Sequence, residues 1–199
     1  MALPVTPWRV LFVSPATMAL LVAGAALATA VCAWGMQRHP DRTRATVRVL
    51  LWSWVVLVAV VTVAPDQPPG TYQEPVNWRL GASFRASGIG HSEDGLLVSQ
   101  YIGNAAMFFP VGVLGWFSSR RGWWTLVWSA ALSASIEALQ QVMAAGRTAD
   151  IDDLFCNSFG AATGIAVATF SYFIVMFRRS RGAAAEGDRK AVGRRAGTG

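Results

Sequence analysis

The feature that most constrains the fold of this chain is the grouping of its apolar residues into long, continuous blocks. Of its 199 residues, 53% are hydrophobic and only 14% are charged. The blocks lie at 10–36, 48–64, 96–117, 123–145 and 153–177. A bilayer core of about 30 Å needs about 20 apolar residues per spanning helix, so each block is long enough to cross it. The sequence therefore predicts a polytopic integral membrane protein with about five transmembrane helices.

The same blocks also indicate the fold class. Lipid cannot satisfy exposed backbone N–H and C=O groups, so spanning segments must be helices or a closed barrel. A transmembrane barrel would show alternating apolar and polar residues, and these blocks do not alternate. We therefore expect an all-α, multi-pass protein of the plasma membrane, with the lipid bilayer as its main partner. Cleavage of the first block as a signal peptide is disfavoured, because it would leave the arginine-rich segment at 38–48 outside the cell.

The basic residues follow the predicted topology. The formal net charge is +6, and segments 37–48, 120–121 and 178–199 together hold 13 of the 17 Lys and Arg residues. All three segments face the cytoplasm if the N-terminus lies outside, as the positive-inside rule requires. We therefore predict an outside N-terminus and a cytoplasmic C-terminus. Because the charge is explained by topology, we expect no nucleic-acid partner.

Three regions follow from this organisation. Residues 1–44 form the first transmembrane helix and a basic cytoplasmic loop, and residues 45–177 form the main transmembrane domain. Residues 178–199 are small, charged and aperiodic, which predicts a disordered cytoplasmic tail held near anionic headgroups by its arginines. Cys32 and Cys156 both fall inside apolar blocks, so neither indicates a disulfide or a metal site.

One polar segment, SIEALQQVMAAGRTADIDDLF at 135–155, interrupts this apolar pattern. Glu137 is expected about two turns below the outer end of the fourth helix, with Gln140 on the same helical face. A carboxylate at that depth costs roughly 2.5 kcal/mol or more if it faces lipid, so it should face the bundle. Asn104 and Asn157 fall at comparable depths in the third and fifth helices. The predicted outer-leaflet polar pocket comprises Asn104, Glu137, Gln140, Arg147, Asp150, Asp152, Asp153 and Asn157.

The sequence leaves two questions about this segment open. The aspartates precede an apolar helix, where carboxylates cap free N–H groups, and Asp150 and Asp153 have capping-box spacing. They can therefore be helix caps or part of a site. Arg147 can pair with Glu137 or with the aspartates. A buried Glu137 would otherwise need protonation or a hydrogen bond from Gln140 or Asn104.

Three further residues have structural interpretations. Gly160 and Gly164 lie one turn apart on a predicted helix, which is typical of a close helix contact. Pro110 cannot donate to the carbonyl of Ala106, so we expect a kink in the third helix there.

Several runs together resemble a VanZ-like domain, the family named for a teicoplanin-resistance protein. They are GNAAMFFPVGVLG at 103–115, the basic hinge at 120–121, SIEALQQ at 135–141 and GRTADIDDLFCNSFGAATG at 146–164. The resemblance covers roughly residues 45–177. The matching positions are Asn104, Pro110, Gly112, Glu137, Gln140, Arg147, Asp150, Asp152, Asp153, Asn157, Gly160 and Gly164.

Two classes of function are compatible with these residues. We favour a non-enzymatic module without a cofactor, because the sequence has no metal-ligand spacing, no nucleophile with a base and no phosphate-cradling loop. The resemblance implies a ligand such as a lipid-linked cell-envelope precursor or a lipoglycopeptide, or an envelope protein partner, with a link to teicoplanin resistance. The alternative is an intramembrane enzyme acting on an envelope lipid or glycan, with Glu137 as acid or base and a divalent cation on the aspartates.

Overall fold

A computed structural model of the protein describes residues 15–63, 79–81, 94–143 and 150–196, which form five α-helices and no strand. The helices are α2 (Pro15–Arg38), α3 (Pro40–Val63), α5 (Asp94–Ser119), α6 (Gly122–Met143) and α7 (Ile151–Ala196). Each apolar block of the sequence coincides with one of them. The predicted all-α fold class is therefore confirmed for the described residues.

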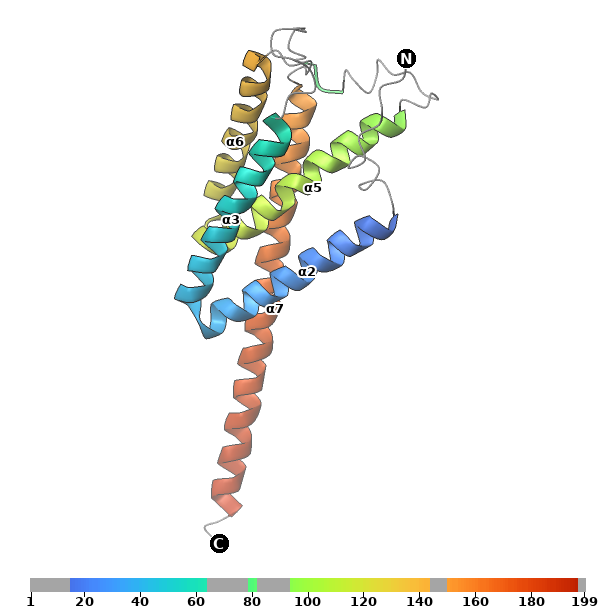
Figure 1. Cartoon of the computed structure of the whole chain (residues 1–199). Helices are drawn as coiled ribbons and strands as arrows, with labels where there is room; N and C mark the ends of the chain where they lie inside the picture. The colour runs from blue at the N-terminus through green and yellow to red at the C-terminus, as the bar shows by residue number, and fades with distance from the viewer. Residues whose placement is uncertain (1–14, 64–78, 82–93, 144–149, 197–199) are drawn as a thin grey trace.

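The five helices pass back and forth between two ends of a bundle (Figure 1). We call one end the hinge end, where His39 joins α2 to α3 and Arg120 and Arg121 join α5 to α6. We call the opposite end the loop end, where α6 stops at Met143 and α7 begins at Ile151. Helix α7 runs through the bundle and continues well beyond the hinge end (Figure 1).

The most extensive contact in the described bundle is between α5 and α7. Gly160 and Gly164 of α7 and Gly112 of α5 all lie on this interface. A Cβ atom at any of the three would overlap a backbone carbonyl of the facing helix, so no larger residue fits without moving the helices. The two helix backbones therefore meet directly, as is typical of small residues in membrane helix pairs.

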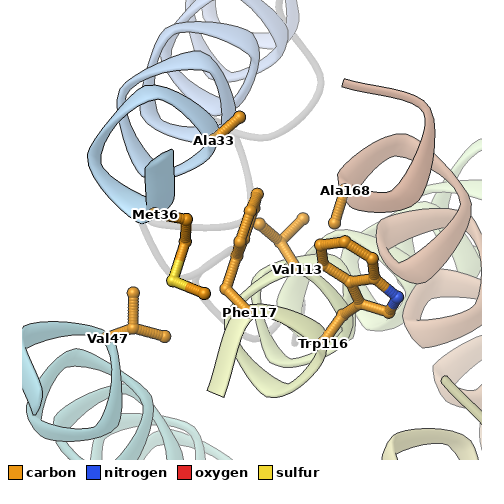
Figure 2. Packing of buried hydrophobic residues seen from close by; sticks show 7 residues of the cluster. All are labelled: Ala33, Met36, Val47, Val113, Trp116, Phe117 and Ala168. Carbon is orange, nitrogen blue, oxygen red and sulfur yellow. The ribbon is translucent and has the colours of Figure 1, made fainter. Parts of the chain in front are cut away.

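Two apolar clusters fill the bundle, one towards each end. The cluster towards the hinge end joins four helices and contains Ala33, Met36, Val47, Val113, Trp116, Phe117 and Ala168. In it the Phe117 ring lies between Met36 and Val113, and Trp116 lies beside Ala168 (Figure 2). The second cluster contains Leu51, Val55, Val58, Phe108, Val111, Ile136 and Ala161. These clusters hold α3, α5 and α7 in register and so fix the polar groups at both ends.

The outer faces of the helices are also apolar. Val56 is 61% exposed, Val142 80% and Phe170 69%, which a water-soluble bundle would avoid. Among the described helices, three are by length and composition apolar enough to cross a membrane: Pro40–Thr62, Gln100–Ser119 and Ile151–Gly182. The surroundings of the bundle are therefore membrane lipid. The count of five spans and their orientation stay predictions.

The described structure differs from the sequence prediction in the tail. The sequence predicts disorder from residue 178, but α7 continues as a helix to Ala196. The segment 183–190 reads AAAEGDRK, in which Ala, Glu, Lys and Arg are strong helix formers. Adding such residues to an existing helix avoids the cost of nucleating a new one. The lack of a hydrophobic period was therefore a poor predictor of disorder in the tail, because this segment extends a helix that already exists.

Pro110 lies inside α5, which remains one helix from Asp94 to Ser119. The indole N–H of Trp54 donates to the backbone carbonyl of Met107 at 2.9 Å, in the turn that precedes the proline. Proline weakens the helical bonds of that turn because it lacks an N–H and its ring crowds the carbonyls. The carbonyl that loses its donor is that of Ala106, so the Trp54 bond joins α3 to α5 one residue away from the missing helical bond.

Candidate functional site

The most enclosed polar group at the loop end is the carboxylate of Asp152, whose side chain is 5% exposed. Its Oδ1 accepts the backbone N–H of Gly81 at 2.7 Å, and its Oδ2 accepts the hydroxyl of Tyr101 at 3.0 Å. Gly81 has a φ of 71°, a left-handed conformation that favours glycine. Each oxygen of this carboxylate therefore has a donor, one from α5 and one from the segment 79–81.

Asp153 connects α7 to a second position on α5. Its Oδ1 accepts the side-chain amide of Asn104 at 2.6 Å. The amide nitrogen of Gln100 lies 3.5 Å from Oδ1 and 3.4 Å from Oδ2, so its contact is longer. Asp152 and Asp153 thus both point towards the first turns of α5, where they meet three polar side chains spaced along one face.

Asp150 has a different role, since it caps α7. Its side-chain Oδ1 accepts the N–H of Asp152 at 2.9 Å, and its carbonyl accepts the N–H groups of Asp153 and Leu154 at 3.1 and 3.4 Å. This is the geometry of an N-cap residue, which satisfies donors that a helix start leaves open. The capping interpretation therefore fits Asp150. The carboxylates of Asp152 and Asp153 are directed at other elements.

Glu137 and Gln140 lie on the same part of α6 but bind different neighbours. Oε2 of Glu137 accepts the backbone N–H of Asp150 at 3.4 Å. The side-chain amide of Gln140 donates to the carbonyl of Thr62, near the end of α3, at 2.6 Å. Gln140 therefore joins α6 to α3, while Glu137 faces the start of α7. Arg147 lies outside the described residues, so both of its predicted pairings stay predictions.

Asn157 lies deeper in the bundle, on the contact between α6 and α7. Its amide nitrogen donates to Oγ of Ser133 at 2.9 Å, and its Oδ1 is buried without a hydrogen-bond partner. The structure thus places Asn157 and Gln140 beside the group of acids rather than in it. We use the name loop-end cluster for the residues that it brings together: Gly81, Gln100, Tyr101, Asn104, Glu137, Asp150, Asp152 and Asp153.

Sequence reasoning missed four of the residues that make these contacts. Gln100 and Tyr101 precede Asn104 by four and three positions, so helical spacing places them on its face and could have found them. Ser133 precedes Glu137 by four positions and could have been found in the same way. Gly81 lies in a long stretch without a period, and nothing in the sequence marks its N–H as a partner of Asp152.

The described contacts of the loop-end cluster are hydrogen bonds to carboxylates. Among the described residues, no group of three or more His, Cys, Asp or Glu side chains could hold a metal ion. Both oxygens of Asp152 already accept from protein donors. On the same stretches of α6 and α7, Leu139, Val142 and Phe155 are 46%, 80% and 58% exposed. Polar groups and outward-facing apolar side chains therefore occur together at this end.

Comparison with known proteins gives one match. The model of the family described as VanZ/LLP1 matches residues 47–175, from the first half of α3 into α7. This region is more than half of the chain and includes every residue of the loop-end cluster. None of the curated proteins and none of the solved structures that were compared matches the chain significantly.

Proposed function

The chain belongs to the VanZ/LLP1 family, and from this premise we propose that it is a membrane binding module whose loop-end cluster holds the polar head of an amphiphile. The ligand class is a lipid-linked cell-envelope precursor or a lipoglycopeptide of the teicoplanin type. In this proposal the loop end lies in the outer leaflet, where such molecules meet the membrane. The acyl or polyprenyl chain of the ligand lies against the exposed apolar faces of α6 and α7.

The observation that supports this most is the position of the cluster at one end of an otherwise apolar bundle. An amphiphile needs hydrogen-bonding groups for its head and an apolar surface for its tail within one molecular length. The contacts of Asp152 with Gly81 and of Asn104 with Asp153 are short, whereas Gln100 to Asp153 and Asp150 to Glu137 measure 3.4–3.5 Å. We expect the ligand to replace the longer contacts and leave the shorter ones intact, so the short contacts preorganise the site.

The charge distribution supports the orientation that this proposal needs. Among residues whose side chains are described, the basic ones gather at the hinge end and only Arg79 lies at the loop end. By the positive-inside rule, this distribution favours a cytoplasmic hinge end. The hinge-end group is Arg38, Arg42, Arg44, Arg48, Arg120, Arg121, Arg178, Arg179 and Arg181.

Binding can be tested with the full chain in lipid nanodiscs. The probes are teicoplanin, its deacylated form and a polyprenyl-linked disaccharide-pentapeptide, with affinity measured by thermophoresis. Asp153→Leu removes the acceptor of Asn104 and should weaken binding of the preferred probe about ten-fold or more. Asp153→Asn keeps an acceptor oxygen and should change the affinity by less than about three-fold. Deacylation should also weaken binding, because it removes the apolar part of the ligand.

The matched control is Asp41→Leu, which removes an exposed carboxylate at the hinge end and should leave binding unchanged. If no probe binds, or if all variants bind alike, the binding proposal is wrong. The enzyme alternative makes the opposite prediction for the conservative variant. Turnover of the polyprenyl-linked probe that needs Mg²⁺ or Ca²⁺ and is lost in both Asp153→Asn and Glu137→Gln would favour an enzyme.

A further inference from the structure

We propose a second binding site, at the hinge end, that holds the phosphate group of an anionic lipid head, with the Arg120 guanidinium and the Gln37 side-chain amide as donors. This site does not depend on the function proposed for the loop end. Its chemistry is recognition of a phosphate oxyanion, which either a lipid headgroup or free phosphate can supply.

Arg120 supplies the main observation. Its guanidinium carbon lies 4.1 Å from the centroid of the Trp116 ring and 3.5 Å from that of Tyr172. The two ring centroids are only 5.6 Å apart, so the rings lie on adjacent sides of the guanidinium, and the Tyr172 side chain also makes a hydrogen bond with it. Nη1 is buried and has no hydrogen-bond partner. A guanidinium that is held by two aromatic side chains and keeps one nitrogen without an acceptor can donate to an oxygen of a phosphate.

The backbone of Arg120 is also unusual. It follows the last turn of α5, and its N–H donates to the carbonyl of Trp116 at 2.7 Å. Its φ is 59°, in the left-handed region, where glycine is the usual residue at a helix end. Gly122 is only two positions away. An arginine in this conformation is costly for the backbone, which is consistent with a use for its side chain.

Gln37 adds a second unpaired donor at the same end. Its Nε2 is buried without a hydrogen-bond partner, while its backbone carbonyl accepts Nη1 of Arg179 at 3.2 Å. Gln37 follows Met36, and Arg120 comes three residues after Phe117. Met36 and Phe117 belong to the same apolar cluster and are neighbours in it (Figure 2). Both donors therefore border one packed core where α2, α5 and α7 meet.

The charges around this site are positive. Burial lowers the pKa of the Arg120 guanidinium; Tyr172 opposes this shift, and the nearby charge of Arg44 adds to it. Arg179 approaches from α7. Asp41, exposed in the first turn of α3, is the one acidic residue at the hinge end whose side chain is described. The positive charges at the hinge end can therefore be balanced by an anion from outside the chain.

Exposed tryptophans indicate where the anion comes from. Trp34 is 52% exposed, Trp123 73% and Trp124 60%, and all three lie within one or two turns of the hinge. Tryptophan gathers at the headgroup level of membranes, so these side chains place the hinge end at that level. Basic pockets between helices at this depth are suited to anionic lipid heads. Lipid phosphate is therefore the expected source.

The experiment uses the full chain in nanodiscs of phosphatidylcholine with increasing phosphatidylglycerol. Bound lipid is counted by native mass spectrometry, and the unfolding midpoint is followed in parallel. Arg120→Gln should weaken the apparent affinity for phosphatidylglycerol about ten-fold, because it removes a charged donor. Arg121→Gln removes the same charge from the next residue, which is exposed, and should change the affinity by less than about two-fold. Gln37→Leu removes the other donor without changing the charge and should weaken binding about three-fold.

A second arm compares phosphate with chloride at equal ionic strength in neutral detergent. If phosphate alone stabilises the unaltered protein but not Arg120→Gln, the site takes the free ion and its chemistry stands. Equal losses in Arg120→Gln and Arg121→Gln would mean general attraction to negative lipid and would overturn the proposal. If Arg120→Gln does not fold, Gln37→Leu decides, since unchanged binding in that variant also overturns it.

Discussion

The two ends of the bundle contrast in how their polar groups are satisfied. At the loop end, acceptors dominate, and the carboxylates of Asp152 and Asp153 are met by donors from α5 and from Gly81. At the hinge end, donors dominate, and Nη1 of Arg120 and Nε2 of Gln37 have no partner. The carboxylates of Asp152 and Asp153 are thus met by donors of the chain itself, whereas two described donors at the hinge end have no acceptor.

This contrast matters because the bundle lies in lipid. A buried donor or acceptor without a partner costs about 1–3 kcal/mol, and water cannot reach the apolar part of a membrane to satisfy it. The loop end meets this requirement with neutral amides, a tyrosine hydroxyl and backbone N–H groups. The hinge end lies level with exposed tryptophans, where lipid headgroups can complete it. The two ends therefore suit different partners.

The largest expected effect tests which end faces outwards. In a variant without Cys32 and Cys156, Leu80→Cys places a thiol on an exposed residue of the loop end and Ser119→Cys places one at the hinge end. An impermeant maleimide added to intact cells should label the first and leave the second unlabelled until lysis, because the basic hinge end is expected in the cytoplasm.

Labelling of both positions after lysis controls for accessibility. The reverse pattern in intact cells would remove the outer-leaflet location from the proposed function. It would leave the phosphate site at the hinge end in place, because both leaflets contain phosphate headgroups.

The second prediction tests whether the two ends behave independently, by disturbing the α5–α7 contact near the loop end. Gly160→Ala puts a methyl group into a backbone carbonyl of α5 near the loop end and should cost about 1–3 kcal/mol of stability. Gly103→Ala is the matched control, since nothing lies within 4 Å of its added Cβ. It should be neutral or stabilise the helix by up to about 1 kcal/mol. Thermal unfolding in detergent, followed by tryptophan fluorescence, measures both.

Gly160→Ala should also spread the pair formed by Asn104 and Asp153, and so weaken binding at the loop end while phosphatidylglycerol binding at the hinge end persists. Equal loss at both ends would show that the bundle behaves as one unit, and the contrast between the ends would not hold.

The sequence predicted the helices well, and the reason is physical. Blocks of about 20 apolar residues in lipid have few structures open to them, so their positions largely decide the fold. The tail from residue 178 is where this reasoning failed. There the decision between helix and disorder depends on a helix that already exists upstream, which local hydrophobicity does not report.

The candidate site was harder to predict. Helical spacing indicates which way a side chain faces, but not which residue on another helix it contacts. Spacing placed Glu137 and Gln140 on the same face of α6, yet Glu137 contacts Asp150 and Gln140 contacts Thr62. The choice depends on how α3 and α7 sit beside α6, which is set by packing across the bundle. The N–H of Gly81 could not be predicted at all, because any residue supplies a backbone donor.

The smallest expected effect compares two glutamines, one at each end. The amide of Gln140 donates to the carbonyl of Thr62 in the last turn of α3, and so joins α6 to α3. The amide of Gln37 is buried without a partner. Methionine has nearly the shape of glutamine but cannot donate. Gln140→Met should therefore cost about 1 kcal/mol, whereas Gln37→Met in neutral detergent should cost nothing or stabilise the protein slightly, because it removes an unmet donor. Thermal unfolding of both variants in the same detergent gives the difference in stability.

Adding phosphatidylglycerol should reverse the sign of the stability change for Gln37→Met, since the unaltered glutamine then gains its acceptor. If both variants lose about the same stability in detergent, the amide of Gln37 is satisfied there without lipid, and the two ends do not differ in the way that their hydrogen bonds indicate.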